Sequence, residues 1–238
     1  MEPAKSGEIK RIVTTGNPEV DKKIGGGIPE GSLSLVEGQS DAGKSVLVQQ
    51  LTYGALMEGF RVVYYTTENT TRSLLRQMDS LSMSVTDHFL LGKLNVYPVP
   101  SALTPEQSVD VFTRLIEHIA RHHSYDIAIM DSLTPFVSNL PEGDTLSFFT
   151  NCKQICDRNK TVFITLHSYA FDESMFIRIR SICDAHLRLR TEEVGEQLVK
   201  VLQVAKIRGA EKTTGNVVSF DVEPGLGMRI VPITKAKA

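Results

Sequence analysis

The sequence has little cysteine, no excess of charge of either sign and no long apolar run. Its three cysteines are too few for a disulfide framework, which favours a reducing cytoplasm. Lysine and arginine total 26 against 28 aspartates and glutamates, and the formal charge of −2 argues against a nucleic-acid-binding protein, which normally has a basic excess. No apolar run approaches the length that spans a bilayer, and residues 1–11 lack the apolar core of a signal peptide. We expect a cytoplasmic protein that reaches a membrane only through a partner.

What the sequence does contain is an alternation of short apolar runs with amphipathic stretches. This pattern is typical of an α/β domain in which helices connect the strands of a mostly parallel sheet, and 238 residues suit one such domain. We predict strands at residues 33–37, 61–66, 94–98, 126–130 and 161–166. We predict helices at residues 46–57, 74–81, 105–122 and 144–158. The third of these helices should begin at Pro105, because Thr104 and Gln107 have the spacing of a capping box.

The C-terminal third has a different pattern, in which short strands are joined by turns. We predict that these strands extend the sheet in antiparallel fashion, at residues 186–190, 199–207, 217–222 and 228–231. The single domain is expected to cover residues 11–233. It would lie between a flexible N-terminus at residues 1–10 and a mobile tail at residues 234–238.

The most informative segment reads GQSDAGKS at residues 38–45, which is the G-x-x-x-x-G-K-[ST] spacing of a phosphate-binding P-loop. A predicted strand precedes it and a predicted helix follows it. The glycines permit a tight turn whose backbone N–H groups surround a phosphate, and the helix N-terminus adds partial positive charge. The alternative is a chance glycine-rich turn. The positions expected to bind the nucleotide are Gly38, Ser40, Asp41, Ala42, Gly43, Lys44, Ser45 and Val46.

Two residues of the P-loop have individual roles in this hypothesis, and two carboxylates follow other predicted strands. Lys44 should reach the β- and γ-phosphates, while the Ser45 hydroxyl should ligate Mg²⁺. Asp131 ends an apolar strand in the manner of a Walker-B acid, which holds Mg²⁺ through a water. Glu68 follows the strand at 61–66, where it could polarise a water that attacks the γ-phosphate. Alternatively, Glu68 begins a helix and favours its dipole.

Three further polar residues are candidates for contacts with the phosphates. Lys206 and Arg208 lie two apart on a predicted strand, so their side chains share a face, and a neighbouring subunit could supply them to a triphosphate. An ordinary solvated face is the alternative for this pair. His167 follows the strand at 161–166 and could sense the γ-phosphate, although a histidine after a buried strand is more often structural.

The order of these motifs resembles the RecA superfamily, and specifically its KaiC-like branch. The lead-in to the P-loop is similar to the signature of that branch, in the segments TTGN at 14–17, VD at 20–21 and IGGGIPEG at 24–31. The KIRG element at 206–209 resembles the intersubunit phosphate contacts of KaiC. Within the branch, the chain resembles the accessory ATP-binding proteins of the archaellum, the archaeal flagellum. That likeness is carried by TTENTT at 66–71, His167, FDE at 171–173 and residues 217–232.

The resemblance implies a RecA-like P-loop fold, with ATP and Mg²⁺ as cofactors. It also implies work beneath the membrane with the hexameric motor and secretion ATPase, the membrane platform protein and other motor-complex subunits, and a hexameric ring at least transiently. One departure matters, because KaiC-type sites carry two consecutive glutamates after the second strand. Here Glu68 is followed by Asn69, which cannot accept a proton from water. We therefore expect ATP to bind while rapid hydrolysis is in doubt.

Three functions follow from these expectations. The first is a nucleotide-dependent switch that docks the motor ATPase, driven by the different affinities of two conformations for ATP. The second is a slow ATPase, or a KaiC-like enzyme that phosphorylates itself, with Glu68 as base and Lys206 and Arg208 acting in trans. The third is a RecA-like DNA-binding protein, which the near-neutral charge opposes.

Overall fold

The structure is a computed structural model that describes residues 11–101, 104–121, 124–138, 140–194, 197–210 and 215–231. The predicted flexible N-terminus at 1–10 and the predicted tail at 234–238 lie outside the described residues. The strands are β1 Ile12–Val13, β2 Ile28–Pro29, β3 Leu33–Gly38, β4 Val62–Thr66, β5 Leu94–Pro98, β6 Ile127–Asp131, β7 Thr161–His167, β8 Ala185–Val194, β9 Gln197–Ile207, β10 Val217–Glu223 and β11 Gly227–Ile230. The helices are α1 Pro18–Lys23, α2 Lys44–Met57, α3 Thr71–Ser80, α4 Thr86–Leu90, α5 Pro105–Arg121, α6 Thr134–Val137, α7 Glu142–Cys156 and α8 Glu173–Ile182.

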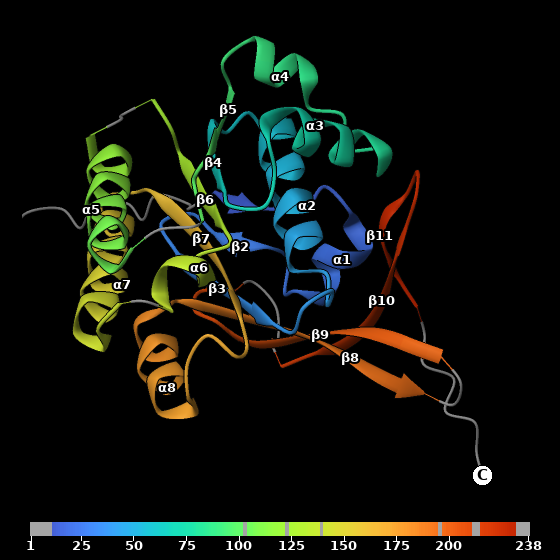
Figure 1. Cartoon of the computed structure of the whole chain (residues 1–238). Helices are drawn as coiled ribbons and strands as arrows, with labels where there is room; N and C mark the ends of the chain where they lie inside the picture. Colours follow the sequence, from blue (N-terminus) through green and yellow to red (C-terminus); the bar gives the residue numbers. More distant parts are fainter. Residues whose placement is uncertain are drawn as a thin grey trace, which may run out of the picture.

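One large sheet organises the molecule (Figure 1). Within the described residues it has nine strands in the order β11-β10-β9-β8-β3-β7-β6-β4-β5. The strands from β8 to β5 in this order are parallel, whereas β9, β10 and β11 are antiparallel to their neighbours. A separate small sheet pairs β1 with β2. The prediction of a mostly parallel sheet with an antiparallel C-terminal extension is therefore confirmed.

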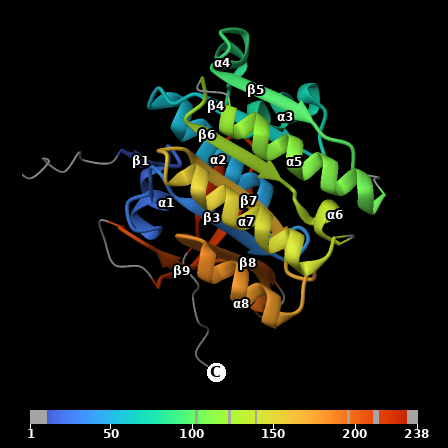
Figure 2. The same ribbon diagram turned by 90° about the vertical axis from the view of Figure 1, so that its left-hand side faces the viewer.

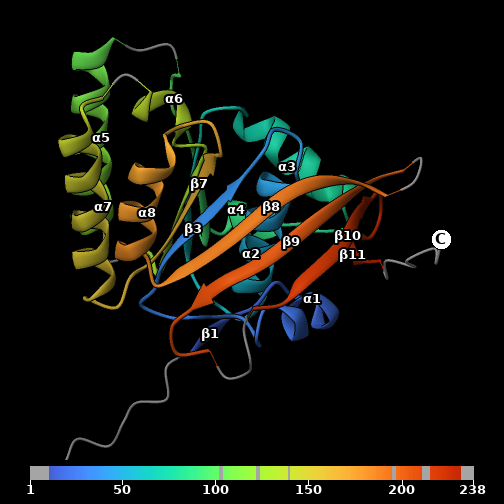
Figure 3. The same ribbon diagram turned by 90° about the horizontal axis from the view of Figure 1, so that it is seen from below.

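Helices cover both faces of this sheet. Helices α5, α7 and α8 lie on one face (Figure 2), and α2 and α3 lie on the other, as the view from below makes plain (Figure 3). The central strands are buried on both sides, so successive residues serve different cores. Leu35 packs in the cluster under α5, α7 and α8, while Val36 packs in the cluster around α2.

The sequence prediction missed helix α8, and this omission led to an error about strand β8. Asp172 caps α8 by accepting a hydrogen bond from the Met175 N–H at 2.8 Å, and Phe176 and Ile179 bury its apolar side. Because this helix carries the chain back between β7 and β8, β8 runs parallel to β3. The antiparallel extension therefore begins only at β9.

The predicted start of α5 is confirmed, with both bonds of the capping box. The Thr104 N–H donates to Gln107 Oε1 at 2.9 Å, and the Gln107 N–H donates to Thr104 Oγ1 at 3.3 Å. The capping box joins residues that are close in sequence. The candidate site, in contrast, is formed by the ends of strands that are distant from one another in sequence.

Candidate functional site

The P-loop connects the end of β3 with the start of α2, as its motif requires. Gly43 is the N-cap of α2, and Lys44 is the first residue of the helix. The Lys44 ammonium lies inside the loop, where its Nζ donates to the carbonyl oxygen of Gln39 at 2.6 Å. Burial lowers the pKa of Lys44, and the negative charges of Asp131 and Glu68 oppose that change. The loop thus presents a mostly buried cation that an anionic ligand would stabilise.

Two glycines of the P-loop are required by the strands that pack against it. Gly43 has a φ of 95°, and a Cβ there would lie 3.0 Å from the ring of Phe220 on β10. A Cβ at Gly38 would lie 2.4 Å from the carbonyl oxygen of Leu189 on β8. The C-terminal strands therefore support the loop directly. Sequence reasoning did not find Phe220 or Leu189, since nothing in their spacing relates them to the loop.

Asp131 lies at the end of β6, beside the P-loop, and is almost fully buried. Its Oδ1 accepts from Ser45 Oγ at 3.1 Å and from Thr165 Oγ1 at 2.8 Å. Its Oδ2 accepts from the Tyr64 hydroxyl at 2.7 Å. The structure thus brings together Ser45 and Asp131, the two residues predicted to hold Mg²⁺. A hydroxyl and a carboxylate are oxygen ligands of the kind that this hard cation prefers, so the residues fit the ion.

A cavity of about 560 Å³ lies over the P-loop, within the usual range for a small-molecule site. It is lined by Ser40, Asp41, Gly43, Lys44, Ser45, Val46, Glu68, Asn69, Gln77, Asp131, Ser132, His167, Lys200 and Val222. Of the predicted contacts, Gly38 and Ala42 are buried beneath the loop and do not line it. Five of the lining residues were not predicted. Asn69 and Ser132 adjoin the predicted Glu68 and Asp131, whereas Gln77, Lys200 and Val222 come from α3, β9 and β10, far from the P-loop in sequence.

Glu68 lies in the loop between β4 and α3 and lines the cavity. The alternative that it begins a helix is wrong, because α3 starts at Thr71 and is capped by Thr70. Burial and the nearby charge of Asp131 raise the pKa of Glu68, while Lys44 opposes the shift. The raised pKa makes the Glu68 carboxylate a better proton acceptor than an ordinary glutamate.

Asn69, which stands where the resemblance to KaiC-type sites leads us to expect a second glutamate, has a structural contact. Its Oδ1 accepts a hydrogen bond from Ser73 Oγ at 3.0 Å, and its backbone N–H donates to Thr66 Oγ1 at 3.1 Å. Both bonds shape the turn that leads into α3. The amide oxygen is therefore occupied, and it has no basicity to offer a water molecule.

His167 ends β7 and reaches the cavity from the side of α6. Its backbone N–H donates to Thr134 Oγ1 at 2.9 Å, and its Nδ1 lies 3.2 Å from the same oxygen. Its ring stacks on Tyr169, with 4.9 Å between the ring centroids. Burial and the positive charge of Lys44 lower the pKa of His167, so the neutral imidazole is favoured.

Lys206 and Arg208 lie at the opposite end of the sheet from the P-loop of the same chain. Ile207, between them, pairs with Ala185, which is itself level with Ser34 near the start of β3. The P-loop begins at the other end of β3, about 13 Å further along the strand at about 3.3 Å per residue. The pair therefore has no place in this chain's own cavity.

The predicted shared face of this pair is observed. The Nζ of Lys206 donates to the carbonyl oxygen of Arg180 at 2.8 Å, near the end of α8. Arg208 Nη1 lies 3.4 Å from Asp184 Oδ1, and Arg208 remains more than half exposed. Ile207 points the other way, into the core around α2. Both cations are thus held beside the end of α8 and Asp184, away from the cavity over the P-loop.

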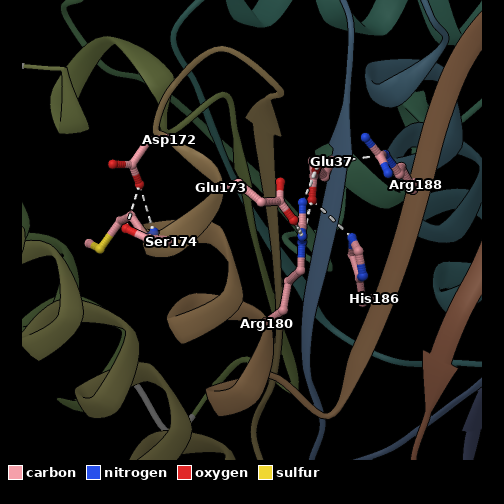
Figure 4. Close-up of polar contacts among 8 residues, drawn as sticks. Glu37, Asp172, Glu173, Ser174, Arg180, His186 and Arg188 are labelled. Atoms are coloured by element: carbon pink, nitrogen blue, oxygen red, sulfur yellow. Dashed lines mark hydrogen bonds and ion pairs between the residues drawn. The ribbon is translucent and has the colours of Figure 1, made fainter.

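A buried ionic cluster joins the P-loop strand to α8 and β8 (Figure 4). Glu37, which directly precedes the P-loop, has a 1% exposed side chain and accepts from Arg180 Nε and Nη2 at 2.9 and 2.8 Å. His186 Nε2 lies 3.0 Å away and Arg188 Nε 3.7 Å away. Burial alone raises the pKa of Glu37, but hydrogen bonds and charge from His186 and Arg180 outweigh burial and lower the pKa to about 2. Arg180 also binds Glu173, the first residue of the same helix, at 2.6 Å, and its bonds to Glu37 tie α8 to the P-loop strand.

The P-loop, the strand-end acid and the sheet that holds them define a RecA-like P-loop domain of the KaiC class. The family model described as "ATPase: KaiC" matches residues 13–235. Within this class, the chain belongs to the FlaH family of archaeal flagellar ATP-binding proteins. It is 31% identical to FlaH of Sulfolobus acidocaldarius, over 95% of this chain and all of that protein, and 31% identical to FlaH of Methanocaldococcus jannaschii, over 94% and 96%.

A solved structure supports the same assignment. The crystal structure of flagellar accessory protein FlaH from Methanocaldococcus jannaschii superposes with a TM-score of 0.80 at 29% identity, covering 94% of this chain and all of that chain. In the part of the chain that the structure describes, no helix is both long and apolar enough to cross a bilayer. The three cysteines are buried as free thiols, which agrees with the prediction that they form no disulfide framework.

Proposed function

We propose that this protein is an ATP-binding regulatory component of the archaellum motor and assembly machinery. It acts as a nucleotide-dependent switch that docks the hexameric motor and secretion ATPase, in the cytoplasm beneath the membrane platform protein. The observation that carries the proposal is the P-loop cavity, in which Lys44, Ser45 and Asp131 converge and the candidate base Glu68 is followed by Asn69 instead of a second glutamate. The names of the related proteins, archaeal flagellar ATP-binding proteins, supply the cellular context.

Each end of the cavity suits one part of Mg-ATP. The P-loop N–H groups and Lys44 bind the β- and γ-phosphates, and Ser45 and Asp131 would hold Mg²⁺. The ion would supply positive charge against the phosphates. The cavity continues from the P-loop to Lys200 and Val222 on the C-terminal strands, which leaves room for the nucleoside.

Because Glu68 is followed by an amide and not by a second carboxylate, the cavity is better suited to holding ATP than to hydrolysing it quickly. A base that polarises water contributes about 10²- to 10⁴-fold to such reactions. Glu68 is available for this role, whereas Asn69 is an amide with its oxygen bonded to Ser73. Slow hydrolysis, or autophosphorylation, is the second candidate function, because Glu68 lines the same cavity as Lys44.

A ring of copies would complete the site. Lys206 and Arg208 lie at an outer edge, away from this chain's own P-loop, and carry the positive charge that a neighbour's triphosphate attracts. Binding of ATP between two copies would then stabilise a hexamer, and the ring surface would differ between the ATP and ADP states. That difference is what the motor ATPase would recognise.

The decisive experiment measures particle mass with ATP, with ADP and without nucleotide, and identifies the retained nucleotide after several hours. The wild-type protein should assemble with ATP, retain ATP and bind the purified motor ATPase more tightly than in ADP. Lys44→Ala should lose all three effects, while Lys93→Ala, which removes an exposed lysine far from the cavity, should keep them. Arg208→Ala should bind ATP but remain monomeric.

Two outcomes would contradict the proposal in different ways. If Lys44→Ala kept full ATP affinity and full partner binding, the P-loop would have no part in the function. If ATP turnover were sustained, rose with protein concentration and fell sharply in Glu68→Gln, the protein would be a working ATPase and not a switch.

A further inference from the structure

Asp131 is held by hydroxyl groups from the strands on either side of it. In the sheet, β6 lies between β7 and β4, and each neighbour contributes one donor. Thr165 on β7 donates to Oδ1 at 2.8 Å, and Tyr64 on β4 donates to Oδ2 at 2.7 Å. Both residues are fully buried, so no water competes for these bonds. An ionised carboxylate only accepts hydrogen bonds, so both hydroxyls must be the donors.

We propose that Tyr64 is a positioning residue that fixes the orientation of the Asp131 carboxylate and thereby sets the Mg²⁺ affinity of the nucleotide site. This inference rests on the proposed function, since it concerns the ion that accompanies ATP. The Tyr64 side chain does not line the cavity. Its hydroxyl also interacts with Gln49 on α2, but its effect on the ion would pass through Asp131.

The two donors hold different oxygens of the Asp131 carboxylate, Thr165 binding Oδ1 and Tyr64 binding Oδ2. The terminal torsion of an aspartate is broad, so the carboxylate can rotate unless its surroundings prevent this. The Tyr64 hydroxyl holds Oδ2 on the side of β4, and Oδ1 is thereby left facing Ser45 at 3.1 Å. Oδ1 and Ser45 Oγ are the oxygens that would approach the cation together. Groups that orient a metal ligand in this way change metal affinity by about 10- to 100-fold when they are removed.

The sequence offers a matched control beside Tyr64. Tyr65 is the next residue on β4 and points to the opposite face of the sheet, where its hydroxyl contacts His118 Nδ1. Tyr64→Phe and Tyr65→Phe therefore each remove one phenolic hydroxyl from strand β4. Only the first deletion removes a donor from Asp131.

The test measures ATP affinity by calorimetry over a series of Mg²⁺ concentrations and again in EDTA. Tyr64→Phe should require about 10- to 100-fold more Mg²⁺ for half of the Mg²⁺-dependent gain in affinity. Its affinity in EDTA should equal that of the wild type, because the P-loop contacts are untouched. Tyr65→Phe should match the wild type in both conditions. Paramagnetic resonance of Mn²⁺ titrated into the ADP complex should give the same order of metal affinities.

An unchanged Mg²⁺ requirement in Tyr64→Phe would overturn the inference, and so would an equal loss of affinity in EDTA, which would indicate a general structural defect. If Tyr64→Phe does not fold, Thr165→Val decides, because it removes the other donor with little change of shape; it should also raise the Mg²⁺ requirement. Absence of ATP binding by the wild-type protein would instead overturn the proposed function, and the inference with it.

Discussion

Replacing Glu37 by glutamine should reveal how much the buried cluster behind the P-loop contributes to stability. The ordinary pKa of the carboxyl is 4.5, and the cluster lowers it to about 2. A difference of about 2.5 units corresponds to about 3 kcal/mol, at about 1.4 kcal/mol per unit. The side chain is 1% exposed, so solvent screening reduces this value little. Glu37→Gln keeps the volume but gives Arg180 and His186 a neutral partner.

The sign of the pH dependence follows from the direction of the shift. Because the folded-state pKa is depressed, the contribution of Glu37 is fully present above pH 4.5 and is lost as the pH falls towards 2. We therefore expect Glu37→Gln to be about 3 kcal/mol less stable than the wild type at pH 7. The gap between the two proteins should narrow steadily from pH 5 to pH 3.

Urea unfolding followed by circular dichroism, at intervals between pH 7 and pH 3, measures this gap. Glu173→Gln is the matched control, since Glu173 binds the same Arg180 with a side chain that is 68% exposed. Exposed ion pairs contribute about 0.2–1 kcal/mol, so the control should lose far less at every pH. The reasoning is refuted if the two variants lose equal stability at pH 7, or if the Glu37→Gln gap stays constant down to pH 3.

Two further predictions concern single side chains. Gly54→Ala should lower the free energy of unfolding by about 1–3 kcal/mol, because the added Cβ would lie 2.2 Å from the Thr14 carbonyl oxygen. Gly143→Ala should raise it by about 0.5 kcal/mol, because nothing lies within 4 Å of the added Cβ. Urea unfolding measures both changes, and an equal effect of the two substitutions would contradict the packing argument. Asn69→Glu should raise ATP hydrolysis about tenfold or more by placing a second carboxylate beside Glu68. Unchanged phosphate release would show that a missing base does not limit turnover.

The elements that the sequence predicted well are those encoded by neighbouring residues. The P-loop is a run of eight residues whose chemistry depends on their spacing, and its strand and helix follow the expected order. The start of α5 depends on a capping box between Thr104 and Gln107. Alternating apolar runs predicted most strands to within a few residues. Local rules sufficed in each case, because the stabilising contacts lie close together in sequence.

The features that the sequence did not reveal depend on contacts between distant segments. Helix α8 was missed because its short apolar stripe is interrupted by arginines. Without this helix to return the chain, β8 was wrongly predicted to be antiparallel. Glu37 lies at the end of an apolar strand, and this position by itself indicates only weakly that a buried carboxylate needs cations nearby. Which cations these are, Arg180 and His186, depends on the packing of α8 and β8 beside β3.

The sequence by itself determined the motifs of this protein, namely a P-loop, an acid at the end of an apolar strand and a glutamate, Glu68, followed by an asparagine. The tertiary structure alone decided what surrounds them. It places Tyr64 and Thr165 on either side of Asp131 and sets Lys206 and Arg208 at the far end of the sheet. The physical reason is that a motif is local, whereas orientation and burial arise where strands remote in sequence become neighbours in one sheet.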